Sequence, residues 1–149
     1  MRLDLYQAET ARIAAEQASL LDLAHERLLN GMALNRLEQS GVLHALQVLI
    51  ENAIGKAKHL VKAANLPVPV SAYDAFTTLA RLEILGQGEI EKWNAVIGLR
   101  NRIVHDYMNL DMAYVLDIVR SQHYRLIVAF LLAPLPALPG NDILHLDSH

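Results

Sequence analysis

The sequence predicts an all-α protein, an up-down bundle of about five helices. Apolar residues make up 53% of the chain and aromatic residues only 5%. A balance of this kind, rich in leucine and alanine, favours helices packed on helices over sheets. Apolar residues also recur at helical spacing, and no stretch shows the alternation that is typical of a strand. Short segments containing glycine, proline or asparagine separate the helical stretches, as expected for a bundle with short loops.

The first two predicted helices are the longest. Residues 3–29 form one amphipathic helix that ends at Asn30-Gly31, with an apolar side made by Leu5, Ile13, Leu20, Leu21, Leu28 and Leu29. A second helix begins near Asn35 or Ser40 and continues to residue 65. Its buried side is marked by Val42, Leu46, Leu49, Ile50, Ala53, Ile54, Ala57, Leu60, Val61 and Ala64. We expect Gly41 to loosen or bend the start of this helix.

The third helix follows a turn that contains two prolines, residues 66–70, which cannot be helical throughout. Ser71, with Asp74 three residues later, is typical of an N-cap pair. The helix that it opens is predicted to end near Leu85. Residues 86–88, Gly-Gln-Gly, then separate it from a fourth helix.

The last helix is predicted over residues 112–132, with Asp111 placed to cap it. Regular helix is excluded after it by Pro134, Pro136 and Pro139. We therefore expect residues 1–133 to form one helical domain and residues 134–149 to form a proline-containing tail.

Charge and composition limit the classes of function. A net charge of −3 argues against a general polyanion binder, so any RNA contact would need a local basic groove. The chain has no cysteine, which excludes disulfides, thiolate zinc sites and cysteine nucleophiles. The N-terminus lacks a signal-peptide core, and no apolar run approaches the length of about twenty residues that a bilayer span needs. We expect a soluble, cytoplasmic protein with no membrane segment. Its high apolar share suggests that some surface is buried against a second copy.

The fourth predicted helix, residues 89–107, carries an unusual group of polar residues. At about 100° per residue, its apolar stripe is formed by Trp93, Val96, Ile97, Ile103, Val104 and Tyr107. Arg100 lies in the middle of this stripe, where an arginine is rarely left without a role. Asn101 and His105 share the flank beside it, whereas Arg102 points toward water. Each residue alone is explained by a surface helix whose arginine extends out of the core. The guanidinium, amide, imidazole and phenol together indicate a site.

Residues 100–107 resemble the R-N-x3-H-x-Y signature of HEPN-domain ribonucleases, and more closely the HepT toxins. The resemblance includes residues 46–53 (LQVLIENA) and the S-x-Y-x-x-F pattern of residues 71–76. It covers about residues 41–132. Glu83 stands where members of the family often carry glycine, and the tail has no counterpart in them.

The resemblance implies an endoribonuclease, and the chemistry of three residues agrees with it. RNA carries its own nucleophile, the 2′-hydroxyl. The planar guanidinium of Arg100 matches phosphate oxygens, and His105 titrates near neutral pH and so could act as general base or acid. Asn101 could hold the imidazole or orient a phosphate. This mechanism requires neither a metal nor another cofactor.

One helix supplies one arginine and one histidine, whereas acid–base cleavage commonly uses a group on each side of the phosphate. In HEPN relatives two copies of this helix meet across a two-fold axis, so the resemblance implies a symmetric homodimer with a composite site. An apolar stripe interrupted by Arg100 agrees with a helix face that lies half inside the protomer and half inside the dimer.

Tyr107 is predicted to lie two turns beyond Arg100 on the same side, and a core or interface aromatic is an equally good reading of it. The resemblance implies another role. HepT toxins are paired with a nucleotidyltransferase antitoxin, MntA, which adds AMP to this tyrosine. The added phosphate would occupy Arg100 and block RNA entry. We therefore expect the toxin component of a toxin–antitoxin system, neutralised by AMPylation of Tyr107 by an MntA-like partner.

Basic residues on the second helix are weaker candidates. Lys58 and Lys62 lie four apart and could bind RNA together with Arg102, although such a run is more often only the solvated side of a helix. Glu51 is either solvated or paired with an arginine of the site. Two other readings remain: a non-catalytic helical partner or nucleotide-binding subunit of a nucleotidyltransferase, and a plain dimerisation module. A scaffold needs none of the motif residues, which favours the enzyme.

Overall fold

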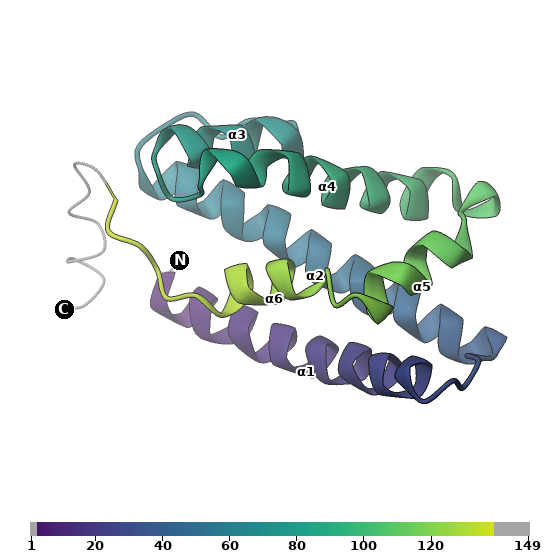
Figure 1. Cartoon of the computed structure of the whole chain (residues 1–149). Helices are drawn as coiled ribbons and strands as arrows, with labels where there is room; N and C mark the ends of the chain where they lie inside the picture. The colour runs from purple at the N-terminus through teal and green to yellow at the C-terminus, as the bar shows by residue number, and fades with distance from the viewer. Residues whose placement is uncertain (1–2, 139–149) are drawn as a thin grey trace.

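A computed structural model of the chain describes residues 3–138 (Figure 1). Within them lie six α-helices, two short 3-10 helices and no strand. The α-helices are α1 (Leu3–Leu29), α2 (Arg36–Ala63), α3 (Ala72–Arg81), α4 (Ile90–His105), α5 (Met112–Arg120) and α6 (Arg125–Leu132). The 3-10 helix η1 (Gln87–Glu89) precedes α4, and η2 (Tyr107–Asn109) follows it. The all-α prediction is confirmed.

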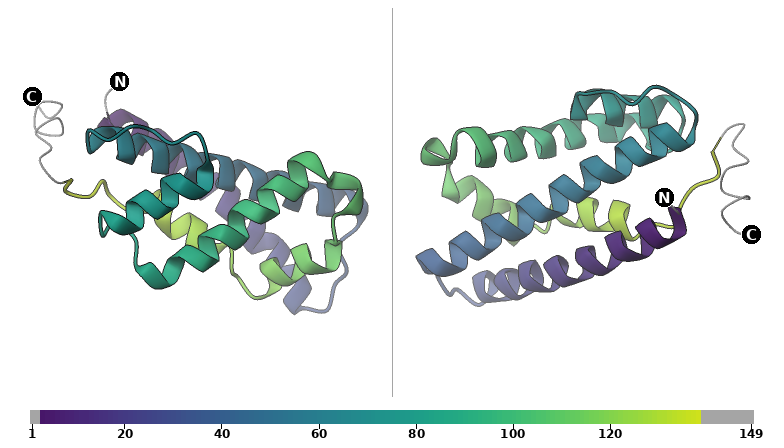
Figure 2. Two further views of the ribbon diagram at one scale, coloured as in Figure 1. Left: turned by 90° about the horizontal axis from the view of Figure 1, so that it is seen from above. Right: turned by 180° about the vertical axis from the view of Figure 1, so that it is seen from behind.

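The central helix is α2, which contacts α1, α3, α4 and α6. Figures 1 and 2 show α1 on one side of α2 and the pair α3 and α4 on the other, with α6 beside α1. Most of the residues predicted to form the buried side of the second helix are buried, with Leu46, Leu49 and Ile50 fully so. Burial on several sides explains why this helix is the most uniformly apolar of the long ones.

An aromatic cluster fixes α4 against its neighbours. Phe76 of α3 stacks on Trp93 of α4, with ring centroids 4.3 Å apart and an interplanar angle of 14°. Phe130 of α6 meets the edge of Trp93 at 5.1 Å. Phe76 and Trp93 have no exposed surface. Such pairs contribute about 0.5–1.5 kcal/mol each beyond the burial of their area, so the cluster holds three helices in one register.

Side-chain caps open three helices, and two of these caps, Ser71 and Asp111, follow the prediction. Asn35 opens α2 with a capping box, in which its side chain accepts from the Glu38 amide and the Glu38 side chain accepts from the Asn35 amide. Ser71 accepts from the amide of Asp74 at 3.4 Å, and Asp111 accepts from the amide of Ala113 at 3.0 Å. Helix α2 therefore starts at the earlier of its two predicted positions, next to Asn35. Caps of this kind contribute about 1 kcal/mol each to stability.

The helix ends differ from the prediction in two places. Four helices are followed, two positions after their last residue, by a residue with positive φ: Gly31, Asn65, Glu83 and Gln122. At Gln122 the amides of Gln122 and His123 donate to the carbonyls of Val119 and Ile118, the Schellman pattern. The single helix predicted over residues 112–132 is therefore wrong, and two helices, α5 and α6, take its place. Likewise α3 ends at Arg81, before the expected Leu85, because Glu83 has φ of 62°.

The expected apolar side of the first helix is also partly wrong. The buried residues of α1 are Leu3, Thr10, Ala14, Leu21 and Ala24. Leu5, Leu20 and Leu29 are instead exposed. The buried positions are separated by steps of three, four or seven residues, and several are small. Their spacing and size let α1 lie close against the neighbouring helices, so the larger leucines beside this stripe face outward.

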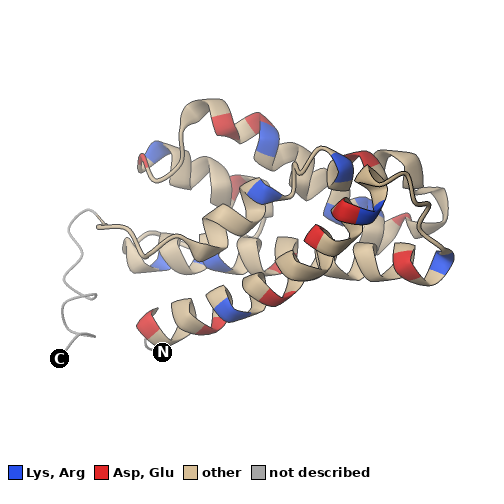
Figure 3. Ribbon diagram, turned by 60° about the horizontal axis from the view of Figure 1, so that its bottom comes forward, with Lys and Arg blue, Asp and Glu red and all other residues tan. Residues whose placement is uncertain are grey.

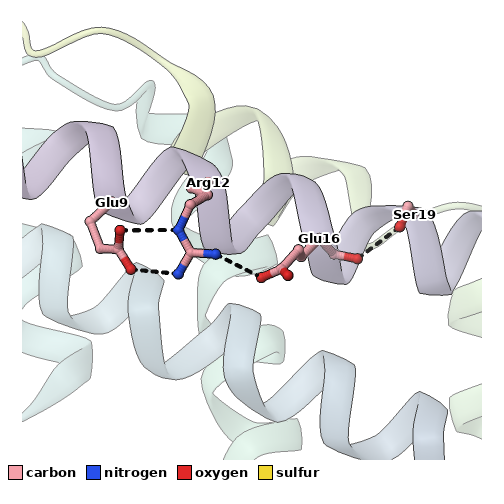
Figure 4. A network of polar contacts seen from close by, with 4 residues as sticks. All are labelled: Glu9, Arg12, Glu16 and Ser19. Carbon is pink, nitrogen blue, oxygen red and sulfur yellow. Dashed lines mark hydrogen bonds and ion pairs between the residues drawn. The ribbon is translucent and has the colours of Figure 1, made fainter.

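The outer face of α1 carries a network of polar contacts (Figure 4). Arg12 bonds Glu9 at 2.6 Å and Glu16 at 3.2 Å, and the Ser19 hydroxyl donates to the Glu16 carbonyl at 2.9 Å. Charges of both signs are interspersed along the helices in Figure 3. Because these side chains are exposed to water, the pairs contribute little to stability.

The two ends of the described chain lie together. Leu138, beyond the last helix, is buried against Leu3 and Ala63. Residues 139–149 of the predicted tail lie outside the described residues. Within residues 3–138, no helix is both long and apolar enough to cross a membrane.

Candidate functional site

The motif residues occupy the end of α4 and the turn that follows it. His105 is the last residue of α4. Asp106 leaves helical geometry, with φ of −143° and ψ of 39°, and Tyr107 begins η2. The Asp106 carboxylate accepts from the Asn109 side chain at 2.8 Å, a local contact that competes with helix continuation. The expectation that the helix runs through Tyr107, on the same side as Arg100, is therefore wrong.

Arg100 is half-buried at the boundary of the core. Its side chain is 22% exposed, and one guanidinium nitrogen, Nη1, lies 3.5 Å from Glu51 Oε1 of α2. The pairing of Glu51 with an arginine of the site, one of the two alternatives for this residue, is thus observed. Nε is buried and has no hydrogen-bond partner among the described residues. Arg100 therefore does not use all of its donors within the described residues.

Asn101 faces α3. Its amide nitrogen Nδ2 lies within hydrogen-bonding distance of the Tyr73 hydroxyl, at 3.5 Å. In the sequence, Tyr73 is marked only by the S-x-Y-x-x-F pattern of the resemblance. Helical spacing cannot connect Tyr73 with Asn101, because the two residues are far apart in the chain. The contact exists because α3 and α4 run antiparallel, with Phe76 opposite Trp93 and Tyr73 opposite Asn101.

His105 and Tyr107 are exposed. Tyr107 keeps 53% of its surface, so a core position is excluded within this protomer. On a straight helix, five positions turn the chain by about 140° and advance it by roughly 7.5 Å. Arg100 and His105 therefore point to different sides of α4, Arg100 toward α2 and His105 toward the flank that also carries Asn101.

The apolar stripe of α4 follows the prediction only in part. Trp93, Ile97 and Ile103 are buried, but Val104 is 43% exposed, and Leu99, outside the predicted stripe, is buried. Helix α3 begins at residue 72, opposite Asn101, so no residue of α3 lies against the last turn of α4. The end of α4 is uncovered for this reason.

The other candidate RNA-binding residues are dispersed. Arg102 is exposed on the outer side of α4, as predicted. Lys58 donates to the Val70 carbonyl at 2.9 Å, and Lys62 is exposed. Both lysines lie beyond Glu51 on α2, about 10 and 16 Å from it along the helix axis, toward the end where α3 begins. The structure brings neither lysine to the end of α4.

Lys56 is the buried member of the same basic run. It is 1% exposed, and its ammonium donates to the carbonyls of Phe130 and Ala133 at 2.8 Å each. Burial lowers the pKa of Lys56 from 10.5 to about 8. This lysine anchors the end of α6 and takes no part in the candidate site.

A cavity of about 410 Å³ lies on the other side of α4, between it and the α5–α6 pair. Its walls are mainly apolar, including Leu99, Ile118 and Leu126, and none of the four motif residues lines it. No group of three or more histidine, aspartate or glutamate side chains within residues 3–138 is arranged to hold a metal ion. The candidate site is therefore the exposed end of α4.

Comparison with known proteins identifies the family of the chain. The chain matches the family described as Ribonuclease HepT-like over residues 13–132, which is most of its length and includes α4 and η2. The chain belongs to the HepT-like ribonuclease family. The resemblance stated from residues 100–107 is thereby confirmed at the level of the family.

One relative of this HepT-like chain is the mRNA nuclease HepT of Shewanella oneidensis. The two are 35% identical over 86 residues, which cover 58% of this chain and 63% of the relative. The matched part therefore spans just under two thirds of that relative's length.

Two solved structures share the fold. A toxin–antitoxin crystal structure with AMP-PNP gives a TM-score of 0.70 at 21% identity, covering 85% of this chain and 97% of that one. The tri-AMPylated Shewanella oneidensis HEPN toxin in complex with MNT antitoxin gives 0.72 at 22% identity, covering 87% and 98%. The chain thus has a HEPN-like helical fold.

Proposed function

We propose that this HepT-like protein is the toxin of a toxin–antitoxin system, a metal-independent endoribonuclease whose site is completed by a second copy of the chain. The observation that carries the proposal is the placement of Arg100 and His105 at the uncovered end of α4, on different sides of the helix. A straight helix cannot close both groups around one phosphate. A symmetric homodimer can bring His105 of one protomer to the Arg100 side of its partner.

The proposed reaction uses only groups of this chain and the RNA. One His105 imidazole takes the proton of the 2′-hydroxyl, and the 2′-oxygen forms a bond to phosphorus. The bond from phosphorus to the 5′-oxygen breaks, and a protonated His105 of the other protomer gives that oxygen its proton. The products are a 2′,3′-cyclic phosphate and a 5′-hydroxyl. The two Arg100 guanidiniums stabilise the charge of the phosphorane.

Asn101 is the third residue of the proposed catalytic set. It lies four positions before His105, so the two side chains share one flank of α4. Its amide can accept a hydrogen bond from the imidazole while it donates another. In the proposal, Asn101 selects the tautomer of His105.

Arg100→Ala and His105→Ala test the assignment. Each variant should lose RNA cleavage by a factor of about 10² or more while the dimer, measured by light scattering, is retained. His123→Ala is the matched control, because His123 is another exposed histidine and lies in the turn between α5 and α6. Cleavage retained in both motif variants would refute the proposal.

The effect of the protein on cell growth distinguishes a toxin from a non-catalytic partner. Expression of the wild-type chain should arrest growth, and His105→Ala should abolish the arrest at equal protein level. The same variant should remove the new RNA ends that appear after induction. Arrest that persists with His105→Ala would favour the scaffold instead.

The proposed regulator is an MntA-like nucleotidyltransferase that transfers AMP to Tyr107. Tyr107 is exposed in η2, directly after the helix that carries Arg100, and a structural relative is an AMPylated toxin in complex with its antitoxin. Incubation with the partner and ATP should raise the intact mass by one or more AMP groups. Tyr107→Phe should stay unmodified and active, while Tyr114→Phe, of similar exposed character, should be modified normally. Modification and silencing of Tyr107→Phe would disprove this site.

RNA binding outside the catalytic set is proposed for Arg102, Lys58 and Lys62. Arg102 is the member nearest to the motif. Replacing it by alanine should raise KM and reduce the salt dependence of binding, with little change in kcat. The lysines should contribute only if the RNA extends along α2.

A further inference from the structure

Tyr73 lies across the face of α4 that carries the motif. Its hydroxyl is 3.5 Å from Asn101 Nδ2, and it would lie 3.9 Å from a Cβ placed on Gly98. Gly98 and Asn101 are three positions apart and therefore adjoin on the helix surface. The phenol hydroxyl therefore lies over the surface of α4 between these two positions.

The position of Tyr73 is fixed by the packing of α3. Phe76, one turn later on the same helix, is fully buried and stacks on Trp93 at 4.3 Å. Ser71 caps the helix start, and the Thr77 hydroxyl donates to the Tyr73 carbonyl at 3.0 Å. Tyr73 itself is 39% exposed, so its hydroxyl adds little to the core. The backbone below the phenol is held by other residues, and the hydroxyl is left for the contact with Asn101.

The contact holds the Asn101 side chain against α3. In the structure Nδ2 donates to the phenol oxygen, and because a phenol can also donate, the contact fixes the conformation of the side chain. With Nδ2 toward α3, the carbonyl Oδ1 is presented on the opposite side of the amide. Oδ1 is then free to accept, and His105 is the ring donor on the same flank of α4.

We propose that Tyr73 is a positioning residue, whose hydroxyl holds the Asn101 side chain in the conformation that the site uses. The inference rests on the proposed ribonuclease function. Tyr73 acts through Asn101 and does not itself touch the reacting atoms. Loss of its hydroxyl therefore affects catalysis through the fraction of protein in which the Asn101 side chain has the correct conformation.

Tyr73→Phe removes only the hydroxyl and tests the proposal directly. A neutral hydrogen bond of this kind corresponds to a loss of roughly threefold to tenfold in kcat, with KM changed by less than about twofold. The unfolding midpoint should shift by no more than about 2 °C, because the side chain is at the surface. Tyr114→Phe is the matched control, since Tyr114 is 40% exposed and Tyr73 is 39% exposed.

A double-mutant cycle separates positioning from a structural role. In an Asn101→Ala background, Tyr73→Phe should cause no further loss of kcat. The side-chain amide resonances of Asn101 in a ¹H–¹⁵N spectrum give a second readout that needs no activity. They should shift in Tyr73→Phe and stay in place in Tyr114→Phe.

The outcomes distinguish this inference from the proposed function. A kcat for Tyr73→Phe equal to that of the wild type would overturn the role of Tyr73 while leaving the nuclease in place. So would a loss of kcat from Tyr73→Phe that is the same in the wild-type and Asn101→Ala backgrounds. Unmoved amide resonances would overturn it as well. If the Asn101 resonances shift in Tyr73→Phe but the wild-type protein cleaves no RNA, the contact is supported and the ribonuclease proposal is refuted.

Discussion

Replacing Glu51 by glutamine removes the negative charge that lies 3.5 Å from the Arg100 guanidinium. Glutamine keeps the shape of the side chain and its capacity to accept a hydrogen bond. The variant therefore changes the competition for Arg100, because a phosphate no longer has to displace or approach a carboxylate. We expect Glu51→Gln to bind RNA more tightly.

The size of the expected effect on RNA binding follows from the exposure of the Arg100–Glu51 pair. Two unit charges at this distance interact by about 1 kcal/mol in water and about 5 kcal/mol at an effective dielectric constant of about 20. The Arg100 and Glu51 side chains are 22% and 47% exposed, so the lower value applies. About 1 kcal/mol corresponds to a decrease of about fivefold in KM, with a smaller effect at high salt.

The assay is cleavage of a short RNA at several salt concentrations. Asp117→Asn is the control for net charge, since Asp117 also pairs with an arginine, Arg120 at 2.6 Å, but on α5. It should leave KM almost unchanged. A KM for Glu51→Gln equal to or above that of the wild type would show that Glu51 does not compete with phosphate, and would refute the reasoning.

Three further predictions concern stability and need no substrate. Glu83 has φ of 62°, so Glu83→Gly should raise the free energy of unfolding by about 1 kcal/mol in urea titrations; a decrease would contradict the account of this helix end. Lys56 has a pKa of about 8 in the folded chain because of burial and 10.5 as its ordinary value, so the unfolded chain binds more protons between these pH values. The free energy of unfolding should therefore rise with pH over this range, and a flat profile would argue against burial of the ammonium. Phe76→Ala should lower the free energy of unfolding by about 3–5 kcal/mol, because Phe76 is fully buried and stacked on Trp93.

Local features of the fold could be predicted from the sequence. The caps at Asn35, Ser71 and Asp111 are decided by side chains within three residues of the backbone groups that they bond. The grouping of Arg100 with Asn101 and His105 is likewise a consequence of helical spacing. Such features depend on neighbouring residues, so a pattern in the sequence contains the information that they need.

Features that depend on tertiary packing could not be predicted in the same way. Glu83 and Gln122 adopt a backbone conformation that neither residue type favours, and packing of the following segment selects it. The sequence alone does not decide whether Glu51 pairs with an arginine, and it contains no signal for the contact of Tyr73 with Asn101. Both contacts join different helices, and helical periodicity says nothing about which helices meet.

The uncovered end of α4 relates the proposed activity to its proposed control. Because α3 reaches only as far as Asn101, His105 and Tyr107 are exposed on the same short stretch of chain. A second copy, an RNA and a nucleotidyltransferase would then all have to reach this stretch. If they do, AMP on Tyr107 inhibits by occupancy. It places a phosphate and the bulk of a nucleotide beside the end of α4, in the path of the RNA, without any change of fold. The fold should therefore be retained in the modified protein, with an unchanged far-UV circular dichroism spectrum and lost cleavage. Inhibition accompanied by loss of helix would require a different mechanism.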